Sequence, residues 1–522
     1  MAFHLRRTAA TIAGKAAMQL SRRLGVGGGT QLPGVVARRV APDVLHDLAA
    51  QLQRGVVLVT GTNGKTTTAR MLAAILKAHG LRVLHNRAGA NLITGLTATA
   101  VAGADLWGRP RAEIGLFETD EAHLPAAIRE TQPRVVVILN LFRDQLDRYG
   151  EVDTIARKWR AALETLPPSS TVVLNADDPA VAYLGTSLPC RVLYYGLEDV
   201  RHGVGAVQHM ADSQFCQRCG TAYVYDPVFY GHVGHYRCPN CGLTRPRPDV
   251  RLERLTLDGI VGAQLVINAP ATAFDLRLPL PGLYNALNAV AATAATLALD
   301  VPPATVRDAL EGFTAAFGRI ERIQIGDRDV LLALIKNPVG ASETVRMIVG
   351  ERGAGSESQA AAGGDPVLEH RVPDTEQTAT VLADESTFER LPTAQPTPDA
   401  APAQPPASDQ RRLSLLILIN DKTADGTDVS WLWDADFERL AGLVEQVVVG
   451  GTRAGDMAVR LKYAGVAPER IIVEPELSPA LDRVLTLGDA GEPLYLLPTY
   501  TAMLELREEL VRRGVAKPFW ED

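Results

Sequence analysis

The residues with the clearest chemistry lie at 56–68, VVLVTGTNGKTTT, where a β-branched run meets Gly61, Gly64, Lys65 and Thr66. Glycines allow the tight turn by which successive N–H groups and a helix start point at an anion. Lys65 would then bind the terminal phosphates of a nucleotide, and the Thr66 hydroxyl a magnesium ion. The general pattern G-x-x-x-x-G-K-[ST] requires a glycine where Val59 stands, so the match is partial. A strand, turn and helix with a chance Gly-Lys-Thr is the alternative.

Acidic residues follow two further runs that read as strands. Glu118 comes directly after the run 114–117, and Asp144 and Asp147 follow the run 135–139. Carboxylates at the carboxyl ends of parallel strands, opposite a phosphate loop, can hold Mg²⁺ directly or through water. We therefore interpret Glu118 as a magnesium ligand rather than a surface charge, and for Asp144 and Asp147 both interpretations stay open.

Four of the five cysteines form two close pairs with eighteen residues between them: Cys216, Cys219, Cys238 and Cys241. Two such knuckles can close a tetrahedral site around zinc, and four thiolates leave no open position for water, so the zinc would be structural. A catalytic zinc, or an iron–sulfur or redox role, is the alternative. His232 and His235 lie between the pairs as spare ligands or as loop residues.

These side chains need a sheet to position them. Apolar β-rich runs at 56–60, 114–117, 135–139, 172–174 and 192–195 alternate with helix-like segments such as 67–79 and 152–166. That alternation predicts an α/β fold with a mostly parallel sheet and helices on both faces. A further helix is expected over 282–300, where Asn288 would face the nucleotide and Asn285 would either join it or cap the helix.

A second alternating set begins at Arg322 and predicts a second α/β domain, with strands near 330–335, 413–419, 447–449, 471–473 and 494–497. It is interrupted at 351–412 by a segment with eight prolines and no Trp or Tyr. Such a composition buries too little apolar surface to offset its ordering entropy, so we expect a disordered insertion. The stretch 420–434 that follows carries four aspartates and two tryptophans, which suggests a site.

The overall charge and composition limit the possible functions. A net charge of −7 with 22% charged residues argues against nucleic acid as the partner. No run of 18 apolar residues appears, and paired thiols fit a reducing compartment, so we expect a cytoplasmic protein. Residues 1–45 form a basic helical lead, which either packs on the next domain or rests on an anionic membrane surface.

Six motifs together resemble the Mur ligase family: GTNGKTTT at 61–68, FETDEAHLP at 117–125, LNLFRDQLDRYGE at 139–151, NADDP at 175–179, GLYNALNAVAA at 282–292 and FGRIERI at 317–323. The cysteine pairs, KNPVG at 336–340 and NDKTADGTDVSWLWDADFE at 420–438 narrow the resemblance to the synthetase subunits of glutamine-hydrolysing lipid II isoglutaminyl synthases. The resemblance implies a central P-loop ATPase domain at 46–318, with a Cys₄ zinc ribbon inserted at about 205–250. A C-terminal Rossmann-like α/β domain would follow at 319–522.

The resemblance also implies the reaction. ATP would phosphorylate the α-carboxyl of D-glutamate in the peptide stem of lipid II, and ammonia would displace the phosphate to leave D-isoglutamine, a step in peptidoglycan synthesis. Thr66 and Glu118 would hold magnesium. The nucleotide would be bound by Gly61, Thr62, Asn63, Gly64, Lys65, Thr66, Thr67, Asn288 and Arg319.

In this family ammonia comes from a separate glutaminase subunit of the GatD type, which borrows the acidic member of its catalytic triad. Asp428, in the ADGTD sequence, is the candidate for that carboxylate, which would orient the partner's histidine. Asp425 and Asp421 are second choices, and a local turn role for all three stays open.

The chain departs from the wider family pattern at two points. Gln145 stands where many Mur ligases have a histidine that helps bind a second magnesium, which puts that site in doubt. Only about 50 residues precede the loop strand, so the domain that binds a uridine nucleotide is missing, which fits a lipid-linked substrate at the membrane surface. The alternatives are a Mur-type ligase that joins an amino acid instead of ammonia, and a zinc-ribbon ATPase that binds nucleic acid.

Overall fold

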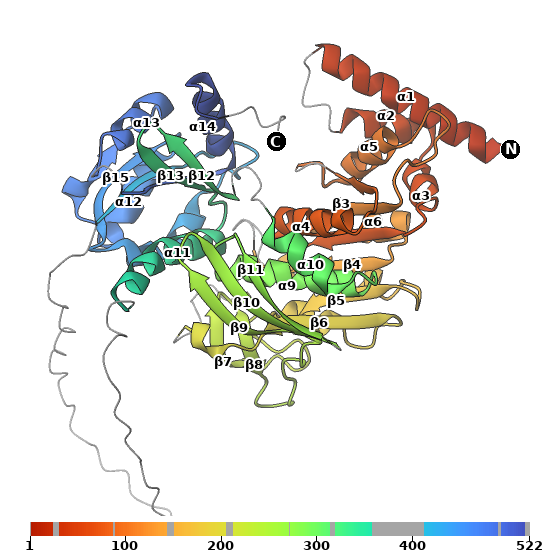
Figure 1. Cartoon of the computed structure of the whole chain (residues 1–522), viewed down its shortest axis with the longest axis horizontal. Helices are drawn as coiled ribbons and strands as arrows, with labels where there is room; N and C mark the ends of the chain where they lie inside the picture. The colour runs from red at the N-terminus through yellow and green to blue at the C-terminus, as the bar shows by residue number, and fades with distance from the viewer. Residues whose placement is uncertain are drawn as a thin grey trace, which may run out of the picture.

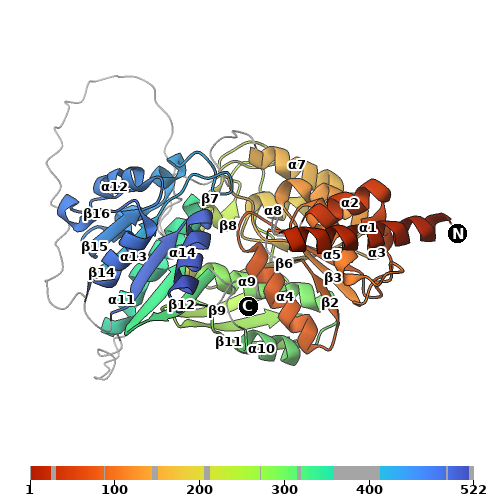
Figure 2. The same cartoon turned by 90° about the horizontal axis from the view of Figure 1, so that it is seen from above.

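The computed structural model describes residues 2–24, 31–86, 89–143, 151–204, 212–270, 272–313, 319–357, 412–488 and 492–516. Within them the chain forms two α/β units that lie side by side in Figures 1 and 2. A long helix, α1 (Ala2–Leu24), lies at the end of the larger unit that faces away from the smaller one.

The larger unit is built on a sheet that has nine strands among the described residues, in the order β11-β10-β9-β6-β5-β4-β1-β3-β2. The strands from β2 to β9 pair in parallel, and β10 and β11 extend the edge antiparallel. Their bounds are β1 (Val56–Thr60), β2 (Val83–His85), β3 (Ile114–Glu118), β4 (Val135–Ile138), β5 (Thr171–Asn175), β6 (Arg191–Leu197), β9 (Val250–Asp258), β10 (Gly262–Ala269) and β11 (Thr272–Leu278).

Helices cover both faces of this sheet, which confirms the sequence prediction. The central strands β1, β3, β4 and β5 are buried along their whole length, as expected for β-branched runs covered on both sides. One face packs against α4 (Lys65–Ala78), α9 (Leu283–Leu297) and α10 (Pro303–Glu311). The other packs against α2 (Leu32–Val40), α3 (Val44–Ala49), α5 (Ile93–Gly103), α6 (Leu124–Thr131), α7 (Glu151–Leu163) and α8 (Pro179–Leu184).

The N-terminal lead is packed on the larger unit through α1. A Cβ at Gly14 would lie 2.9 Å from Val101 Cγ1 and 3.0 Å from Pro33 O, so the helices approach closely at this glycine. The interpretation of the lead as a helix packed on the next domain is therefore confirmed. Across the described ranges, no helix combines the length and apolar character needed to cross a bilayer.

The smaller unit has six described strands in the order β12-β13-β17-β14-β15-β16, of which only β12 runs antiparallel to its neighbour. The strands are β12 (Arg319–Ile325), β13 (Arg328–Ala333), β14 (Leu413–Leu418), β15 (Val444–Gly450), β16 (Ile471–Val473) and β17 (Leu494–Pro498). Its helices are α11 (Pro338–Glu357), α12 (Ala454–Tyr463), α13 (Leu477–Leu485) and α14 (Tyr500–Arg512). Helix α11 continues to Glu357, past the expected start of the insertion at about 351. Residues 358–411 lie outside the described residues, and the insertion stays a prediction.

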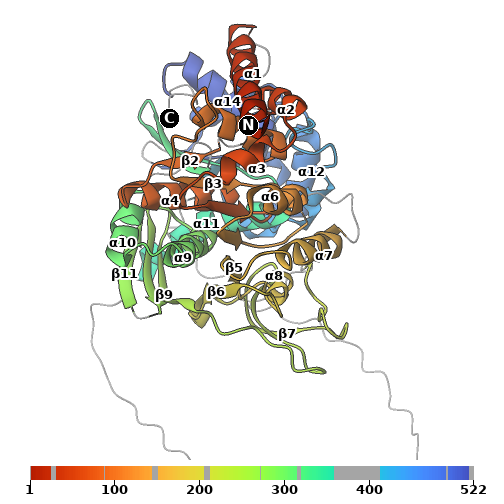
Figure 3. The same cartoon turned by 90° about the vertical axis from the view of Figure 1, so that its right-hand side faces the viewer.

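The cysteine segment forms a small hairpin of β7 (Val224–Tyr230) and β8 (Val233–Arg237). Figures 1 and 3 place it beside β6. Short 3₁₀ turns complete the chain: η1 (Glu121–His123), η2 (Val200–His202), η3 (Ser430–Asp434), η4 (Phe437–Leu440) and η5 (Pro468–Arg470).

Candidate functional site

The glycine loop joins β1 to α4 in a conformation that only glycine adopts readily. Gly61 has φ +138° and Gly64 has φ +86°. A Cβ at Gly64 would lie 2.3 Å from Asn288 Oδ1, and one at Gly61 would lie 3.0 Å from the backbone N and O of Asn140. Each glycine is thus required both by its φ angle and by a close neighbour. The contact at Gly64 places Asn288 of α9 beside the loop, and its contact with a nucleotide stays a prediction.

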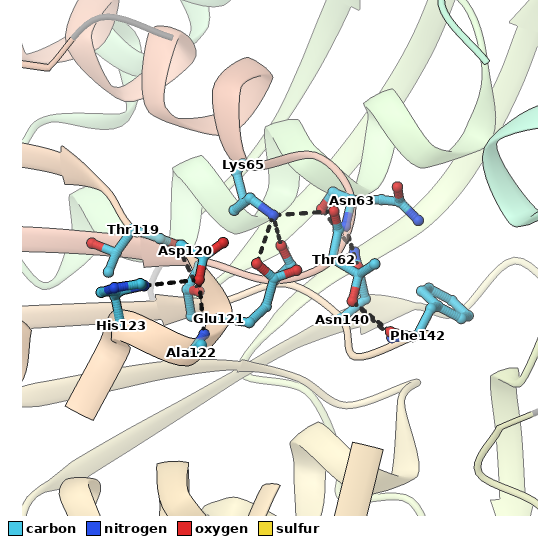
Figure 4. Close-up of polar contacts among 12 residues, drawn as sticks. Thr62, Asn63, Lys65, Thr119, Asp120, Glu121, Ala122, His123, Asn140 and Phe142 are labelled. Carbon is cyan, nitrogen blue, oxygen red and sulfur yellow. Dashed lines mark hydrogen bonds and ion pairs between the residues drawn. The ribbon is translucent and has the colours of Figure 1, made fainter. Parts of the chain in front are cut away.

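Hydrogen bonds hold the loop against the segment that follows β4. Thr62 Oγ1 donates to Phe142 O and accepts from Phe142 N, both at 2.9 Å (Figure 4). Asn63 N donates to Asn140 Oδ1 at 2.8 Å, and Asn140 Nδ2 donates to Asn63 O at 3.1 Å. Thr62 is one of the residues expected to bind the nucleotide, and its hydroxyl is engaged in fixing the loop. The loop is therefore organised by the protein itself.

Lys65 begins α4 and is buried. Its Nζ donates to Gly61 O at 2.6 Å and to Thr62 O at 3.2 Å, and forms an ion pair with Glu121 Oε2 at 3.1 Å (Figure 4). Three oxygens thus converge on one ammonium at the mouth of the loop. Sequence reasoning did not single out Glu121, although it stands in the same FETDEAHLP motif as Glu118.

Glu118 ends β3, next to the strand that leads into the loop, since Val59 of β1 pairs with it. It is buried, and Asn86 fixes its backbone through bonds of 2.8 and 2.9 Å. Among the described residues no basic side chain forms an ion pair with this carboxylate. Thr66 lies in the first turn of α4 and is also buried.

A pocket opens beside the loop and reaches the smaller unit. Its lining includes Asn63, Gly64 and Thr67 of the loop, Asn285 and Asn288 of α9, Tyr195, Tyr230 and Tyr284, and Lys336, Glu343 and Thr344 of the smaller unit. Asn285 does not cap α9, because the N-cap is Gly282 and no side chain caps it; Asn285 Nδ2 donates to Pro281 O at 2.7 Å, and the residue lines the pocket. Burial raises the pKa of Glu343 to about 6, although Arg346 and Arg439 oppose that shift.

Direct contacts between the two units flank this pocket. Asn337 Nδ2 donates to Asn63 Oδ1 at 2.9 Å, so the KNPVG sequence contacts the glycine loop. Arg346 of α11 donates to Phe229 O at 2.8 Å and to His202 O at 3.1 Å. A ligand in the pocket would therefore contact both units.

Some of the predicted residues are not placed. Asp144, Gln145 and Asp147 lie outside the described residues. Arg319 starts β12, where its backbone pairs with Ala333. Its side chain is not among the parts of the chain that the structure describes.

The four predicted cysteines meet in one cluster, with their Sγ atoms all within 4.8 Å of one another. The two knuckles have the same backbone pattern. Gly220 N donates to Cys216 O at 2.8 Å and Gly242 N to Cys238 O at 3.2 Å, and both glycines have φ above +70°. His235 instead belongs to β8, where its Nε2 lies 2.7 Å from Leu197 O.

The NADDP turn at 175–179 is buried and joins the hairpin to the sheet. Asp178 accepts from Ala180 N and Leu141 N at 3.0 and 2.9 Å, and its Oδ2 lies 3.3 Å from His232 Nε2. Neither Asp178 nor His232 has an exposed side chain. The neighbouring Asp177 pairs with Arg245 at 2.6 Å. Both carboxylates therefore have structural contacts, and Asn175 is the residue of this turn that lines the pocket.

The three aspartates after β14 differ in their burial, hydrogen bonds and ion pairs. Asp425 is buried and accepts from Thr501 N at 2.7 Å and from the Thr501 hydroxyl. Asp421 accepts from Thr452 Oγ1 at 2.8 Å and pairs with Arg453 at 3.3 Å. Asp428 is half-buried and accepts from Ser430 N at 2.8 Å, and its hydrogen bonds with Ser430 lower the pKa of its carboxyl.

Exposed aromatic side chains lie on the elements next to Asp428. Trp433 of η3 is 52% exposed and Tyr463 of α12 is 72% exposed, and their ring centroids lie 5.6 Å apart. The Arg460 guanidinium lies 5.6 Å from the Trp433 ring centroid. This pair of rings is an exposed apolar surface of the kind found at protein interfaces.

Comparisons with known proteins match both units. Residues 59–226 match the family model of the Mur ligase middle domain, and residues 404–503 that of the MurT ligase C-terminal domain. The chain is similar to the lipid II isoglutaminyl synthase (glutamine-hydrolyzing) subunit MurT of Streptococcus pneumoniae. The identity is 32% over 516 residues, which cover 98% of this chain and 99% of that protein.

Solved structures show the same fold at low sequence identity. A pseudomurein peptide ligase type C from Methanothermus fervidus is 19% identical with a TM-score of 0.59, covering 90% of this chain and 80% of that one. Mycobacterium tuberculosis folylpolyglutamate synthase, complexed with ADP and AMPPCP, is 16% identical with a TM-score of 0.54, covering 91% of this chain and 94% of that one.

Proposed function

The chain belongs to the MurT family, and from this premise we propose that it is the synthetase subunit of a glutamine-hydrolysing lipid II isoglutaminyl synthase. It amidates the α-carboxylate of D-glutamate in the peptide stem of lipid II to D-isoglutamine, using ATP. The observation that carries this proposal is the preorganised glycine loop, with buried Lys65 at its mouth, opening into a pocket between the two units. The family also argues against a nucleic-acid-binding ATPase.

The chemistry requires activation because a carboxylate is a poor electrophile at neutral pH. The carboxylate oxygen takes the γ-phosphoryl group of ATP, and ADP leaves. Ammonia then attacks the acyl carbon of the mixed anhydride, the C–O bond to phosphate breaks, and a proton is lost from the nitrogen. Preorganised N–H groups and an ammonium are suited to this transfer, because charge accumulates on the phosphoryl oxygens.

Lys65 and the loop of residues 61–67 bind the phosphates in this proposal. The Lys65 ammonium exchanges its ion pair with Glu121 for the nucleotide oxygens, so Glu121 holds the lysine in position before ATP arrives. Asn288 contacts the nucleotide from α9, beside Gly64, and Arg319 from the start of β12.

Thr66 and Glu118 would hold magnesium. The donor set fits, because Mg²⁺ prefers carboxylate and hydroxyl oxygens, and a buried carboxylate normally has a counter-charge or a metal. Glu118 is 5% exposed, and no ion pair to it is found in the described part of the chain. Magnesium would neutralise charge on the phosphates.

Zinc fits the cluster of Cys216, Cys219, Cys238 and Cys241. Four sulfurs within 4.8 Å of one another match a closed tetrahedral site, and the backbone bonds of the two knuckles orient them before metal binds. The zinc would be structural, since no position remains for water.

A glutaminase subunit of the GatD type would supply the ammonia. Asp428 is our candidate for the carboxylate given to its histidine, because Asp425 is buried with both carboxylate oxygens engaged and Asp421 is paired with Arg453. The Trp433 and Tyr463 rings would anchor this partner, as large aromatics do at interfaces.

We further propose domain limits near residues 45 and 318, since the strands of the larger sheet fall within 56–278 and those of the smaller within 319–498. The protein would work in the cytoplasm at the inner face of the membrane, where a lipid-linked substrate is presented.

A single assay tests the central proposal: the protein is incubated with ATP, Mg²⁺, ammonium and detergent-solubilised lipid II, and the stem peptide is analysed by mass spectrometry. We expect the D-isoglutamine product together with ADP. Folded protein that yields no amide would refute the proposal. ADP formed only when an amino acid replaces ammonium would favour an amino-acid ligase.

A further inference from the structure

The outer face of α1 carries a stripe of exposed apolar side chains. Leu5, Ile12 and Leu20 are 67%, 49% and 58% exposed, and Ala9 and Ala16 between them are also exposed. Spacings of four, three, four and four residues place all five on one side of a helix. Such a stripe would normally face a core.

The opposite side of the same helix is the one that packs on the protein. Ala10 and Thr11 are fully buried, and Gly14 lies against Pro33, Ala37 and Val101. The core contacts of α1 are thus made without the stripe. Figures 1 and 2 show α1 along the outer edge of the larger unit.

A rigid loop adds two large side chains beside this helix. Leu106 and Trp107 are 60% and 69% exposed. Asp105 Oδ1 accepts from Trp107 N and Arg109 N, both at 2.8 Å, and Thr8 Oγ1 of α1 donates to Trp107 O at 3.2 Å. The loop is therefore fixed to α1, beside Arg7, Thr8 and Thr11.

Basic side chains outnumber acidic ones around this surface. Residues 1–42 contain no Asp or Glu. Arg6 and Lys15 lie on opposite edges of the stripe and Arg23 lies at its end, while Arg109 and Arg111 are exposed near the loop. Asp105 is the nearby acid, and backbone N–H groups already engage it.

We propose that the α1 stripe, with Leu106 and Trp107, docks this protein on an anionic phospholipid bilayer. Apolar side chains flanked by basic ones are the features by which a helix lies in the bilayer interface, and Trp favours that depth. A second copy of the chain would bring like charges together at the same face. The biological purpose of this docking rests on the proposed function, because lipid II is held in a membrane. The docking itself does not depend on the proposed function.

The test is co-sedimentation of the full chain with vesicles of phosphatidylglycerol and phosphatidylcholine, compared with vesicles of phosphatidylcholine alone. The test variant combines Ile12→Asp with Trp107→Ala. The matched control is Val459→Asp, because Val459 is also β-branched, helical and 48% exposed, but lies on α12 of the other unit. Thermal melts establish that each variant is folded.

We expect binding to the phosphatidylglycerol vesicles that weakens with salt, falls about tenfold or more in the double variant and is unchanged in the control. Equal binding to both vesicle types, no binding to either, or an equal loss in the control would overturn the proposal. So would a dimer, measured by light scattering, that the double variant abolishes while vesicle binding persists.

Amidation assays distinguish a failure of the docking surface from a failure of the proposed function. With ammonium as nitrogen donor, the double variant should match wild type on lipid II in detergent and lose activity on lipid II in vesicles. Wild type that binds vesicles but never amidates lipid II would refute the proposed function and leave the docking surface standing. Equal vesicle activity of wild type and double variant would refute the surface's role in reaching substrate.

Discussion

Replacing Gly64 with alanine tests the geometry of the glycine loop. Two costs add at this position. An L-residue at φ +86° costs about 1–2 kcal/mol, and the new Cβ would lie 2.3 Å from Asn288 Oδ1, with Cγ and Nδ2 of the same amide at 3.0 and 3.1 Å. Since the whole amide must move within a buried helix face, we assign about 1–2 kcal/mol to this clash.

Gly80 provides a matched control, because it has φ +84° and nothing within 4 Å of a Cβ. Gly80→Ala carries the φ cost alone, so the difference between the two variants reports the clash. We expect the thermal midpoint of Gly64→Ala to fall a few degrees further than that of Gly80→Ala, at about 2–4 °C per kcal/mol. Affinity for ATP, measured by calorimetry, should fall for Gly64→Ala and stay near wild type for Gly80→Ala.

Asn288→Ala completes a double-mutant cycle with Gly64→Ala. In the Gly64→Ala background this second change removes the clashing amide, so the double variant should be more stable than the sum of the single effects by about 1 kcal/mol. Additive effects would show that the two residues do not touch. A Gly64→Ala variant no less stable than Gly80→Ala would refute the close approach altogether.

Three further predictions concern other parts of the site. Asp428→Asn should abolish amidation driven by glutamine and the glutaminase subunit while amidation driven by ammonium survives; equal loss of both would place Asp428 in the synthetase reaction instead. Metal analysis should find about one zinc per chain, lost in Cys219→Ser, and a folded, zinc-free wild type would contradict the structural site. The raised pKa of Glu343, about 6, means that the folded state holds this proton more tightly than the unfolded state. Glu343 therefore makes its full contribution to the free energy of unfolding below about pH 4.5. This contribution is lost as the pH rises through about 6, a change of about 2 kcal/mol. Glu343→Gln should remove that slope in urea unfolding between pH 4.5 and 7, and an unchanged slope would assign it to other groups.

The sequence predicted the loop and its strands well because their signals are local. Glycines at fixed spacing beside a β-branched run specify a turn and a buried strand without reference to distant residues. The same holds for the cysteine knuckles, where short spacing brings Cys216 and Cys219 to one side. Asn288 was singled out by its place near the start of the predicted helix 282–300, and the structure places its amide beside Gly64.

Glu121 was missed because the choice between neighbouring acids depends on the η1 turn. Asp120 accepts from Ala122 N at 3.0 Å and starts that turn, which leaves Glu121 to meet Lys65 and Glu118 to end the strand. Nothing in the spacing of E-T-D-E distinguishes these outcomes. The antiparallel strands β9 to β11 were also not predicted, although alternating apolar residues and the Asp258-Gly259 turn signal between β9 and β10 were available.

Long-range contacts explain why the ribbon would matter to the glycine loop, which it does not form. His232, in the turn of the β7–β8 hairpin, packs against Phe142 with ring centroids 4.4 Å apart. The backbone of Phe142 in turn holds the Thr62 hydroxyl of the glycine loop through two hydrogen bonds. Gly231 approaches the same ring, since a Cβ there would lie 2.9 Å from Phe142 Cε1. The hairpin packs on the core of the larger unit through Phe229, Tyr230 and Val233, and a metal in the cysteine cluster would add a second support. If the cluster holds zinc, as we propose, its loss would weaken one of the two supports of the hairpin that packs behind Phe142, whose backbone fixes Thr62.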